Sequence, residues 1–364
     1  MVFETDYNAI LAKIDLIDPI NYGKTRNYLN GSVTRLSPYI SRGVISTRQV
    51  ASIILAKGYK PYEIESFLKE LAWRDFFQQV WIHLGDDINT DIKNKQEFKH
   101  QLMPQKMMSA NTGVDAIDNA IEDLYRSGYM HNHARMYVAS LTCNLAKSHW
   151  HMPAKWMYYH LLDADWASNA LSWQWVASTF SSKQYFANQE NINKFCNTNQ
   201  RGTILDHSYE ELELLDLSEN FGELVDLKLK TNLPEKIEIK VDNNIPTYIY
   251  NFYNLDCNWD VEVDANRVLL LEPSFFNQYP VCDNTIDFVI RLSKNIKGIQ
   301  VFIGEFSELL QLVHSSTIHY KEHPTVKHYQ GKEHAREWMF ENSFGYVPSF
   351  FKYWQRAQKV KRNF

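Results

Sequence analysis

Apolar side chains recur at helical spacing over most of the first half of the chain. Residues 5–18 place them three or four positions apart, which predicts an amphipathic helix. The same spacing returns between 46 and 84, where a break near Gly58–Pro61 separates two predicted helices. Polar, irregular loops are predicted at 21–31 and 87–112. Further helices are predicted at 114–128, 131–149 and 153–163. This half is therefore predicted to be mostly helical.

The pattern changes after about residue 200. Residues 206–240 are rich in Glu, Asp, Leu and Lys and predict a linker with one or two surface helices. Strand-like runs follow at 247–253, 267–272 and 300–303, with helices predicted at 285–295, 306–313 and, broken around 345–348, at 332–360. Short buried strands that alternate with helices predict a parallel α/β sheet. The predicted fold class is therefore an all-helical domain at 1–205, an acidic linker at 206–243 and a smaller α/β (Rossmann-like) domain at 244–364.

Composition allows a sizeable core, because 45% of the 364 residues are hydrophobic and 14% are aromatic. The net charge of −5 argues against a protein that coats nucleic acid. Residues 1–200 carry a net charge of +1, however, so a local basic patch stays possible there. The four cysteines show no metal-binding spacing, and no metal site is predicted. No secretory signal or membrane span is predicted, so we expect a cytoplasmic protein.

Four clusters along the first half carry candidate chemistry. The first, GSVTRLSPYISRG at 31–43, leads Ser and Thr hydroxyls and an Arg into a Pro-initiated helix, and a helix N-terminus with such neighbours can bind an anion such as phosphate. The second, ELAWRDFF at 70–77, puts Glu70, Trp73 and Arg74 on one helical face. The third is GYMHNHARM at 128–136, and the fourth runs from Asp163 through WQW at 173–175. Each cluster alone is equally compatible with a structural role.

The order and spacing of the four clusters resemble those of the photolyase/cryptochrome family. That family follows T-S-R-L-S-P-Y-L with E-L-x-W-R-E-F, then with T-G-x-x-x-x-D-x-x-x-x-x-L-x-x-x-G-x-M-H-N-R-x-R-M and D-G-D-x-A-x-N-x-x-x-W-Q-W-x-A-S. The chain has VTRLSPYI, ELAWRDF, TGVDAIDNAIEDLYRSGYMHNHARM and DADWASNALSWQWVAS. The resemblance covers residues 20 to about 200 and is nearest to bacterial cyclobutane pyrimidine dimer photolyases. It implies a helical domain that binds FAD.

The resemblance also implies which residues hold the cofactor. Tyr22, Thr34 and Ser37 match positions that bind its phosphates, Arg135 and Asp163 match a salt bridge beside the isoalloxazine ring, and Asn169 matches the residue that faces flavin N5. The full cofactor set that the resemblance implies is Tyr22, Thr34, Arg35, Leu36, Ser37, Arg74, Asn132, Arg135, Asp163, Asp165 and Asn169.

By the same resemblance the substrate is a pyrimidine dimer flipped out of damaged DNA. Trp73 and Trp175 match the aromatic walls that sandwich it, and Glu70, Asn132 and Met136 match its other contacts. Electron transfer from photoexcited reduced flavin would then split the dimer, so Asn169 joins these five as a catalytic residue.

The DNA contacts expected from the resemblance are Trp73, Trp175, Arg74 and His133. His133 stands where the family usually has Arg, which replaces a permanent cation by a titratable ring. DNA binding is therefore expected to be weaker and more dependent on pH.

The family's chain of tryptophans that reduces the flavin is matched only in part. Trp173 and Trp150 match its two inner members. The surface member should fall near residue 97, where the chain has Glu97 and Phe98. Trp81 or a nearby Tyr is a possible substitute, and photoreduction is expected to be slower or rerouted.

Ordinary family members carry an α/β antenna domain before the flavin domain, and no such segment is recognised before residue 20. Residues 245–330 resemble a remnant of that domain placed after the flavin domain, from the strand at 247–253 to Gly304–Leu309. An unrelated α/β module is an equally open interpretation. The sequence leaves open whether an antenna chromophore is bound.

Two functions of different classes compete. The first is an enzyme, a DNA photolyase whose partner is damaged DNA, and the matched substrate pocket favours it. The alternative is a cryptochrome-like blue-light signalling flavoprotein without repair activity, which the acidic charge, His133 and the altered second half favour. A third possibility is a structural flavin-binding protein.

Overall fold

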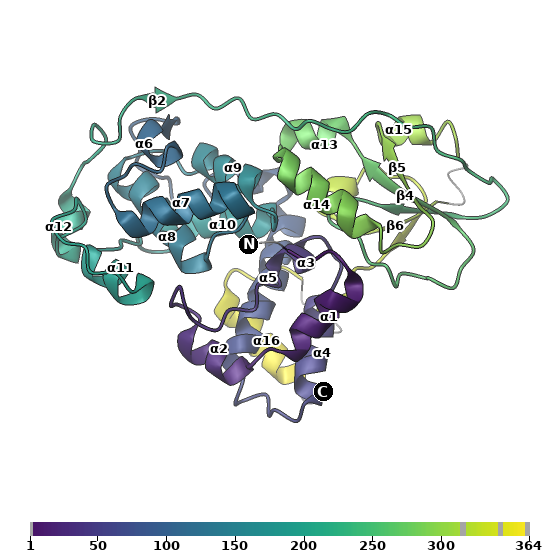
Figure 1. The fold of residues 1–364 in the computed structure, drawn as a ribbon, viewed down its shortest axis with the longest axis horizontal. Coiled ribbons are helices and arrows are strands. Elements are labelled where there is room, and N and C mark those ends of the chain that lie inside the picture. Colours follow the sequence, from purple (N-terminus) through teal and green to yellow (C-terminus); the bar gives the residue numbers. More distant parts are fainter. Residues whose placement is uncertain (1–2, 314–317, 341–344, 361–364) are drawn as a thin grey trace. The chain divides into compact units, whose positions relative to one another are not determined.

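The computed structural model describes residues 3–313, 318–340 and 345–360, and the chain divides into two compact units (Figure 1). Unit 1 consists of residues 21–33 and 86–229. Unit 2 consists of the described residues of 3–20, 34–85 and 230–364. The domain boundaries predicted at 205 and 243 stay a prediction.

Unit 1 is helical, as its apolar spacing predicts. Its elements are η1 (Gly85–Asn89, whose first residue belongs to unit 2), β1 (Met103–Pro104), α6 (Gln105–Met108), α7 (Asp115–Ser127), α8 (Asn132–Ser140), η2 (Leu141–Leu145), α9 (His151–His160), α10 (Trp166–Val176), α11 (Gln189–Cys196), α12 (Tyr209–Leu214) and β2 (Leu224–Val225). The short strands β1 and β2 pair antiparallel. Helix α2 (Pro19–Thr25) crosses the boundary between the units.

Helix α7 shows how local sequence sets these elements. Its apolar positions, which include Ile117, Ile121 and Leu124, are buried along one face. Gly128 follows the helix in the left-handed conformation (φ 67°), which glycine adopts at little cost, and ends it. The Asp118 carboxylate accepts bonds from the backbone N–H and hydroxyl of Thr112 and from the backbone N–H of Gly113. This part of the family motif therefore shapes the loop before α7.

Three predictions for unit 1 need correction. The segment 87–112, predicted to be an irregular loop, contains strand β1 and helix α6, because Met103 and Pro104 pair with Leu224 and Val225. The loop predicted at 21–31 begins with a helix, because α2 runs to Thr25 from Pro19, whose fixed φ suits a first helical turn. The helix predicted at 131–149 ends at Leu145, since α8 passes into the π-helical turn η2. There the Thr142 hydroxyl bonds the carbonyl of Val138 and competes with the regular helical pattern.

Unit 2 contains a five-stranded parallel sheet with the order β5-β4-β3-β6-β7. Its strands are β3 (Thr247–Tyr250), β4 (Asn266–Leu271), β5 (Ile299–Ile303), β6 (Ile318–Lys321) and β7 (Lys332–His334). The helices after β4 and β5 are α13 (Pro273–Gln278), α14 (Asp283–Ser293) and α15 (Phe306–Leu309), and η4 (Pro324–Val326) follows β6. Strand β3, the first of these five in the sequence, therefore lies in the centre of the sheet, and the later strands lie on both sides of it.

The first three strands of this sheet were predicted and the last two were not. The helix predicted over 332–360 is wrong for residues 332–340, where Lys332–His334 forms edge strand β7 and no helix follows, and it is found only from Phe350 on. The polar sequence of β7 carries no strand pattern, and its conformation comes from pairing with β6 in the register His319 to Lys332 and Lys321 to His334. Charged residues on an edge strand also discourage pairing with another chain.

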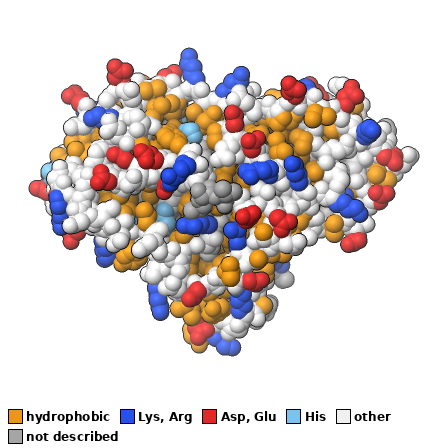
Figure 2. Space-filling view, viewed as in Figure 1, with side chains coloured by type: hydrophobic (Ala, Val, Ile, Leu, Met, Phe, Trp, Pro, Cys, Tyr) orange, Lys and Arg blue, Asp and Glu red, His pale blue; other side chains and the backbone are white. Residues whose placement is uncertain are grey.

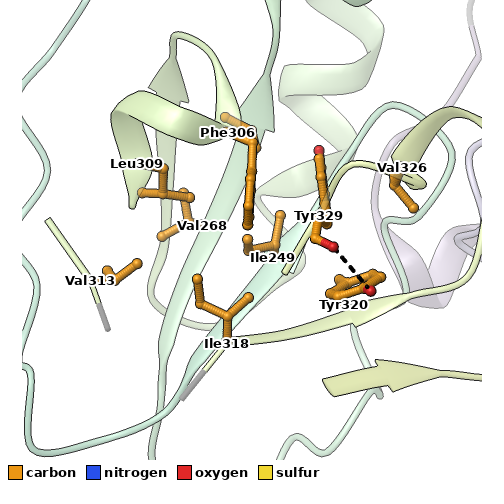
Figure 3. Close-up of a cluster of buried hydrophobic side chains, with 10 residues drawn as sticks. Ile249, Val268, Phe306, Leu309, Val313, Ile318, Tyr320, Val326 and Tyr329 are labelled. Carbon is orange, nitrogen blue, oxygen red and sulfur yellow. Dashed lines mark hydrogen bonds between the residues drawn. The ribbon is translucent and has the colours of Figure 1, made fainter. Parts of the chain in front are cut away.

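A buried apolar cluster lies on one face of this sheet (Figure 3). It combines Ile249 of β3, Val268 of β4, and Ile318 and Tyr320 of β6 with Phe306 of α15. The remaining members are Leu270, Leu309, Val313, Val326 and Tyr329. The Tyr320 hydroxyl donates to the Tyr329 carbonyl at 3.4 Å, which satisfies one buried polar group within the cluster.

The other helices of unit 2 come from both ends of the chain. They are α1 (Tyr7–Asp15), α3 (Ser37–Ser41), α4 (Thr47–Ala56), α5 (Glu65–Leu84) and α16 (Phe350–Val360). Helices α4 and α16 both pack against α5. The buried Asp75 carboxylate of α5 connects α4 to the segment that precedes α16, because it accepts from the Thr47 hydroxyl at 2.9 Å and from the Met339 N–H at 2.7 Å. Among the described residues, no helix is both long and apolar enough to cross a bilayer.

Candidate functional site

A buried ion pair lies at the centre of the candidate site residues of unit 1. Arg135 of α8 donates from Nη2 to both carboxylate oxygens of Asp163, at 3.1 and 3.0 Å, and from Nε to the Met130 carbonyl at 2.9 Å. The Asp163 side chain is only 4% exposed. A carboxylate at such a depth needs a paired cation to offset its lost hydration. The structure therefore brings together the pair that the sequence predicted.

Asp165 and Asn169 sit on the first turns of α10, which packs against both α8 and α9. Asp165 caps the helix, since its carboxylate accepts the backbone N–H of Ser168 at 2.7 Å. One turn later Asn169 is buried and donates from Nδ2 to the carbonyl of Ala154 in α9 at 2.8 Å. This bond holds the amide of Asn169 in a fixed orientation.

The start of α8 carries the other predicted residues of the third motif. Asn132 is exposed and Met136, one turn along the helix, is half-buried. Between them, His133 Nδ1 is hydrogen-bonded to the Asn27 carbonyl at 2.9 Å. The centroids of the His133 and Phe195 rings are 4.7 Å apart. Burial is the main cause that lowers the pKa of His133, so the ring is neutral at pH 7. At that pH His133 supplies no positive charge for a phosphate.

The tryptophans of unit 1 differ in their surroundings. Trp150 and Trp173 are buried, whereas Trp175 is 40% exposed. The Trp150 indole N–H donates to Asp91 at 2.8 Å. The Trp173 indole N–H has no hydrogen-bond acceptor among the described residues. A buried N–H without a protein acceptor is unusual and indicates either strain or a missing partner.

The predicted phosphate-binding residues divide between the units. Tyr22 is half-buried in unit 1, whereas Thr34, Arg35, Leu36 and Ser37 belong to unit 2. The Thr34 hydroxyl accepts the Leu36 N–H at 3.3 Å, and exposed Arg35 has a φ of 54°.

The sequence suggested an anion site at the N-terminus of the helix that follows this turn. That helix, α3, has only five residues and no side-chain cap. Its dipole is therefore a weak source of attraction, and anion binding here depends on the turn itself.

Helix α5 carries the substrate residues predicted in unit 2. Glu70, Trp73 and Arg74 are each half-buried, and Arg74 donates to the Ser41 hydroxyl of α3 at 2.8 Å. The Trp73 ring stacks on Phe350 of α16, with ring centroids 3.8 Å apart and planes 9° from parallel. One face of Trp73, the expected wall of the substrate pocket, is therefore covered by the chain itself.

Two of these partners were missed by the sequence analysis. Phe350 is separated from Trp73 by most of the chain, so no local spacing could connect them. Asp91 lies in a segment predicted to be an irregular loop, where a single carboxylate carries no pattern. Among the residues the structure describes, no group of three or more His, Cys, Asp or Glu side chains is placed to hold a metal ion.

Comparison with known families decides the class of this chain. The family model described as the FAD binding domain of DNA photolyase matches residues 67–249. The chain belongs to the photolyase/cryptochrome family. It therefore carries the FAD-binding domain of that family.

The relatives carry the names of both branches of the family. The deoxyribodipyrimidine photo-lyase of Alkalihalophilus pseudofirmus is 34% identical over 149 residues, which cover 40% of this chain and 31% of that protein. A cryptochrome DASH of Gloeobacter violaceus is 29% identical over 179 residues, which cover 46% and 35%. The crystal structure of a Synechocystis cryptochrome is similar with a TM-score of 0.48, at 23% identity, over 53% of this chain and 44% of that one. The chain spans about a third of the length of the curated relatives it matches.

The residues of unit 1 fit a flavin. The Trp173 indole N–H lacks an acceptor among the described residues, and such a buried polar atom is costly unless a polar partner meets it. The isoalloxazine ring combines a flat apolar body with polar edges, which suits such surroundings. Asn169 lies on α10, which packs against the helix α8 that carries Arg135, and Asp163 is bonded to Arg135, so the three can meet one ring.

Proposed function

We propose that this protein uses FAD and light to split cyclobutane pyrimidine dimers in damaged DNA. The observation that carries the proposal is the buried Arg135–Asp163 pair, which the family motifs predicted and the fold forms within unit 1. Light-excited reduced FAD would supply the electron that opens the dimer. The chain's own residues would bind and orient the cofactor and the dimer, and they would exclude water.

In unit 1, the residues that would hold the isoalloxazine ring of FAD are Arg135, Asp163, Asp165 and Asn169. The bond from Asn169 to the Ala154 carbonyl fixes the amide, so its orientation is set before the cofactor binds. The residues proposed for the rest of FAD are Tyr22 and Asn132 in unit 1 and Thr34, Arg35, Leu36, Ser37 and Arg74 in unit 2.

For the substrate, the proposal rests on the exposed residues of the motifs. Asn132 and Trp175 are exposed in unit 1 and can reach a base that has left the DNA stack. Met136 adds an apolar contact, and Glu70, Trp73 and Arg74 are the assigned residues of unit 2.

The DNA itself would be held by local contacts rather than by net charge. On the face shown in Figure 2, Lys and Arg side chains are interspersed with Asp and Glu side chains. The chain also carries a net charge of −5, so attraction over long range is weak. Even so, each phosphate contact that is made should weaken with added salt.

We further propose that the sheet of unit 2 is a Rossmann-like module that corresponds to the family's antenna domain at a changed position in the sequence. Its parallel strands and the central place of β3 support this. The order of strands and helices from β3 to α15 resembles that of the antenna domain, and an unrelated α/β module is the alternative.

The proposal is tested by light-driven repair with the FAD-loaded, chemically reduced protein. In a binding measurement on the same protein, we expect Trp175→Ala to weaken binding of a dimer-containing oligonucleotide, because a lost base–aromatic stack costs about 1–3 kcal/mol. The control is Tyr62→Ala, which removes an aromatic side chain that is 79% exposed and lies outside the motifs. Equal effects of the two substitutions, or none, would remove Trp175 from the substrate site.

A specific observation favours the second candidate, a cryptochrome-like flavoprotein that repairs nothing. Phe350 already stacks on one face of Trp73, which leaves less of that ring for a flipped base. The neutral His133 also withholds the charge expected at the DNA surface. This candidate predicts bound FAD and a light response, with no preference for dimer-containing DNA.

A further inference from the structure

In unit 1, the Asp91 carboxylate is hydrogen-bonded to the indole of Trp150. It accepts the indole N–H at 2.8 Å and a bond from His149 Nε2 at 3.2 Å on the same oxygen, and its other oxygen accepts the Gln96 N–H at 2.9 Å. The Gln96 side chain in turn accepts the Trp150 backbone N–H at 2.9 Å. The Asp91 side chain is 6% exposed, and Trp150 is fully buried. The carboxylate is therefore held in place on the one polar atom of the indole.

Other buried tryptophans of unit 1 have different partners. Trp166 donates its N–H to the neutral amide of Asn89 at 2.9 Å, and Trp156 donates to the Tyr125 hydroxyl at 3.1 Å. The Trp173 N–H has no acceptor among the described residues. Of these four indoles, Trp150 is the one bonded to a carboxylate.

The charge of Asp91 matters because an indole that has lost an electron becomes a cation and a much stronger N–H acid. A carboxylate at 2.8 Å stabilises that positive charge in a medium of low dielectric and can take the proton. Burial raises the pKa of Asp91, but the bonds from Gln96, Trp150 and His149 outweigh it and hold the pKa below its usual value. Asp91 is therefore ionised at neutral pH and available as a base.

The next position outward cannot carry the oxidation further. Phe98 is 41% exposed and meets the His149 ring edge-to-face, with centroids 4.8 Å apart. A phenyl ring is far harder to oxidise than an indole. The position that the resemblance assigns to the outer tryptophan therefore holds no readily oxidised ring at Phe98, which favours Trp150 as the residue that stays oxidised.

We propose that Trp150 is the terminal electron donor to the flavin in this chain and that Asp91 accepts the proton of its oxidised indole. The inference rests on the proposed flavin site. Trp173 gives one electron to the light-excited oxidised flavin and regains one from Trp150. The Trp150 N–H bond then breaks, its electron pair stays on nitrogen, and the proton moves to Asp91. This leaves a neutral indole radical and a carboxylic acid, and no further oxidant is needed.

The proton transfer traps the separated charge. Electron return to Trp150 requires the proton to return as well, so the radical should last longer than a bare cation would. Asp91 thus does for a buried tryptophan what bulk water does for an exposed one.

The test is flash photolysis of the FAD-loaded, oxidised protein, with the tryptophan radical followed by its absorption. The radical cation and the neutral radical absorb at different wavelengths, so the readout is spectral and needs neither DNA nor repair. We expect Asp91→Asn to slow conversion of cation to neutral radical about 100-fold, the usual loss when a positioned base is removed. The amide oxygen of Asn can still accept the indole N–H, whereas the bond from the Gln96 N–H to the second carboxylate oxygen is lost.

Two further variants make the result specific. Asp87→Asn removes the same charge from an exposed residue of the same segment and should leave the conversion unchanged. Phe98→Trp supplies an exposed indole next to His149. In that background Asp91→Asn should lose its effect, because the oxidation moves outward to a ring in contact with water.

The outcomes separate the two proposals. A protein that binds no FAD would overturn the proposed flavin site and this inference with it. A protein that binds FAD, forms the radical and shows the same conversion rate in Asp91→Asn as in wild type would overturn the inference alone. Unchanged radical yield in Trp150→Phe would overturn it as well.

Discussion

Two charged pairs in unit 1 differ in how far they are buried. Asp163 is almost fully buried and keeps its charge because Arg135 bonds both of its oxygens. By contrast, Arg126 and Asp123 form a pair on the surface, where their side chains are 74% and 54% exposed. Water screens such a pair, and its contribution is close to zero. The two pairs therefore provide a matched test of what burial changes.

We predict that Arg135→Gln lowers the free energy of unfolding, because it leaves the Asp163 carboxylate buried without its cation. The loss should lie at the lower end of the range of about 3–5 kcal/mol that is typical of a broken buried pair. The lower end applies because the Arg135 side chain retains 21% exposure. The measurement is urea unfolding, with and without FAD. Arg126→Gln should change the free energy of unfolding by less than about 1 kcal/mol. Equal losses in the two variants would contradict the structural role assigned to the buried pair.

Helix α5 is the element that joins the N-terminal and C-terminal segments of unit 2. Its Asp75 bonds Thr47 of α4 and the backbone of Met339, and its Glu65 accepts the Trp354 indole N–H of α16 at 3.1 Å. These contacts span most of the chain, so local patterning could not reveal them. The sequence did predict α5 and α14, and in α14 the buried positions repeat with helical period. It could not predict β7, whose polar residues become a strand only beside β6.

We predict a pH-dependent loss of stability for Asp75→Ala. The substitution leaves the Thr47 hydroxyl and the Met339 N–H without their acceptor, at about 1–3 kcal/mol for each buried group. Burial raises the pKa of Asp75 to about 6, so this group stabilises the folded chain more as pH falls from 6 towards 3.8. The loss in Asp75→Ala should therefore be larger at low pH than at pH 8. Chemical unfolding at both values measures it, and a loss that is independent of pH would be inconsistent with a raised pKa.

Helix α16 determines whether Trp73 is available to a flipped base. If the repair proposal holds, Phe350→Ala frees the Trp73 face and should tighten binding of dimer-containing DNA about 2- to 10-fold, the equivalent of one aromatic contact. Phe351→Ala serves as control, because Phe351 is 69% exposed. The measurement is equilibrium binding at fixed salt. Unchanged affinity in Phe350→Ala would show that Trp73 does not contact the DNA.

The candidate site was predictable in part at the scale of residues. Arg135 and Asp163 could be paired from the sequence because the family motifs carry both, and the fold forms the pair. The partners of Trp73 and Trp150 could not, since Phe350 and Asp91 lie outside every motif. The sequence thus shows which side chains take part, whereas the contacts that modify them depend on the tertiary structure.

At the scale of the whole molecule, the chain combines family motifs with a different arrangement. Family membership rests on residues 67–249, and the parallel sheet of β3 to β7 lies mostly beyond them. The chain spans about a third of the length of its curated relatives, so its activity does not follow from theirs. The relatives include both photo-lyases and a cryptochrome DASH. A direct assay of the reaction must therefore choose between repair and signalling.

The measurement that tests the central claim most directly is repair of a dimer-containing oligonucleotide by the purified, FAD-loaded protein. The flavin is reduced chemically beforehand, so the result does not depend on Trp150, Trp173 or Phe98. Under blue or near-ultraviolet light the account predicts that dimers disappear and the absorbance of the intact bases recovers, while a dark sample stays unchanged. Dimers that persist in the light, in a protein with a normal bound-flavin spectrum, would contradict it.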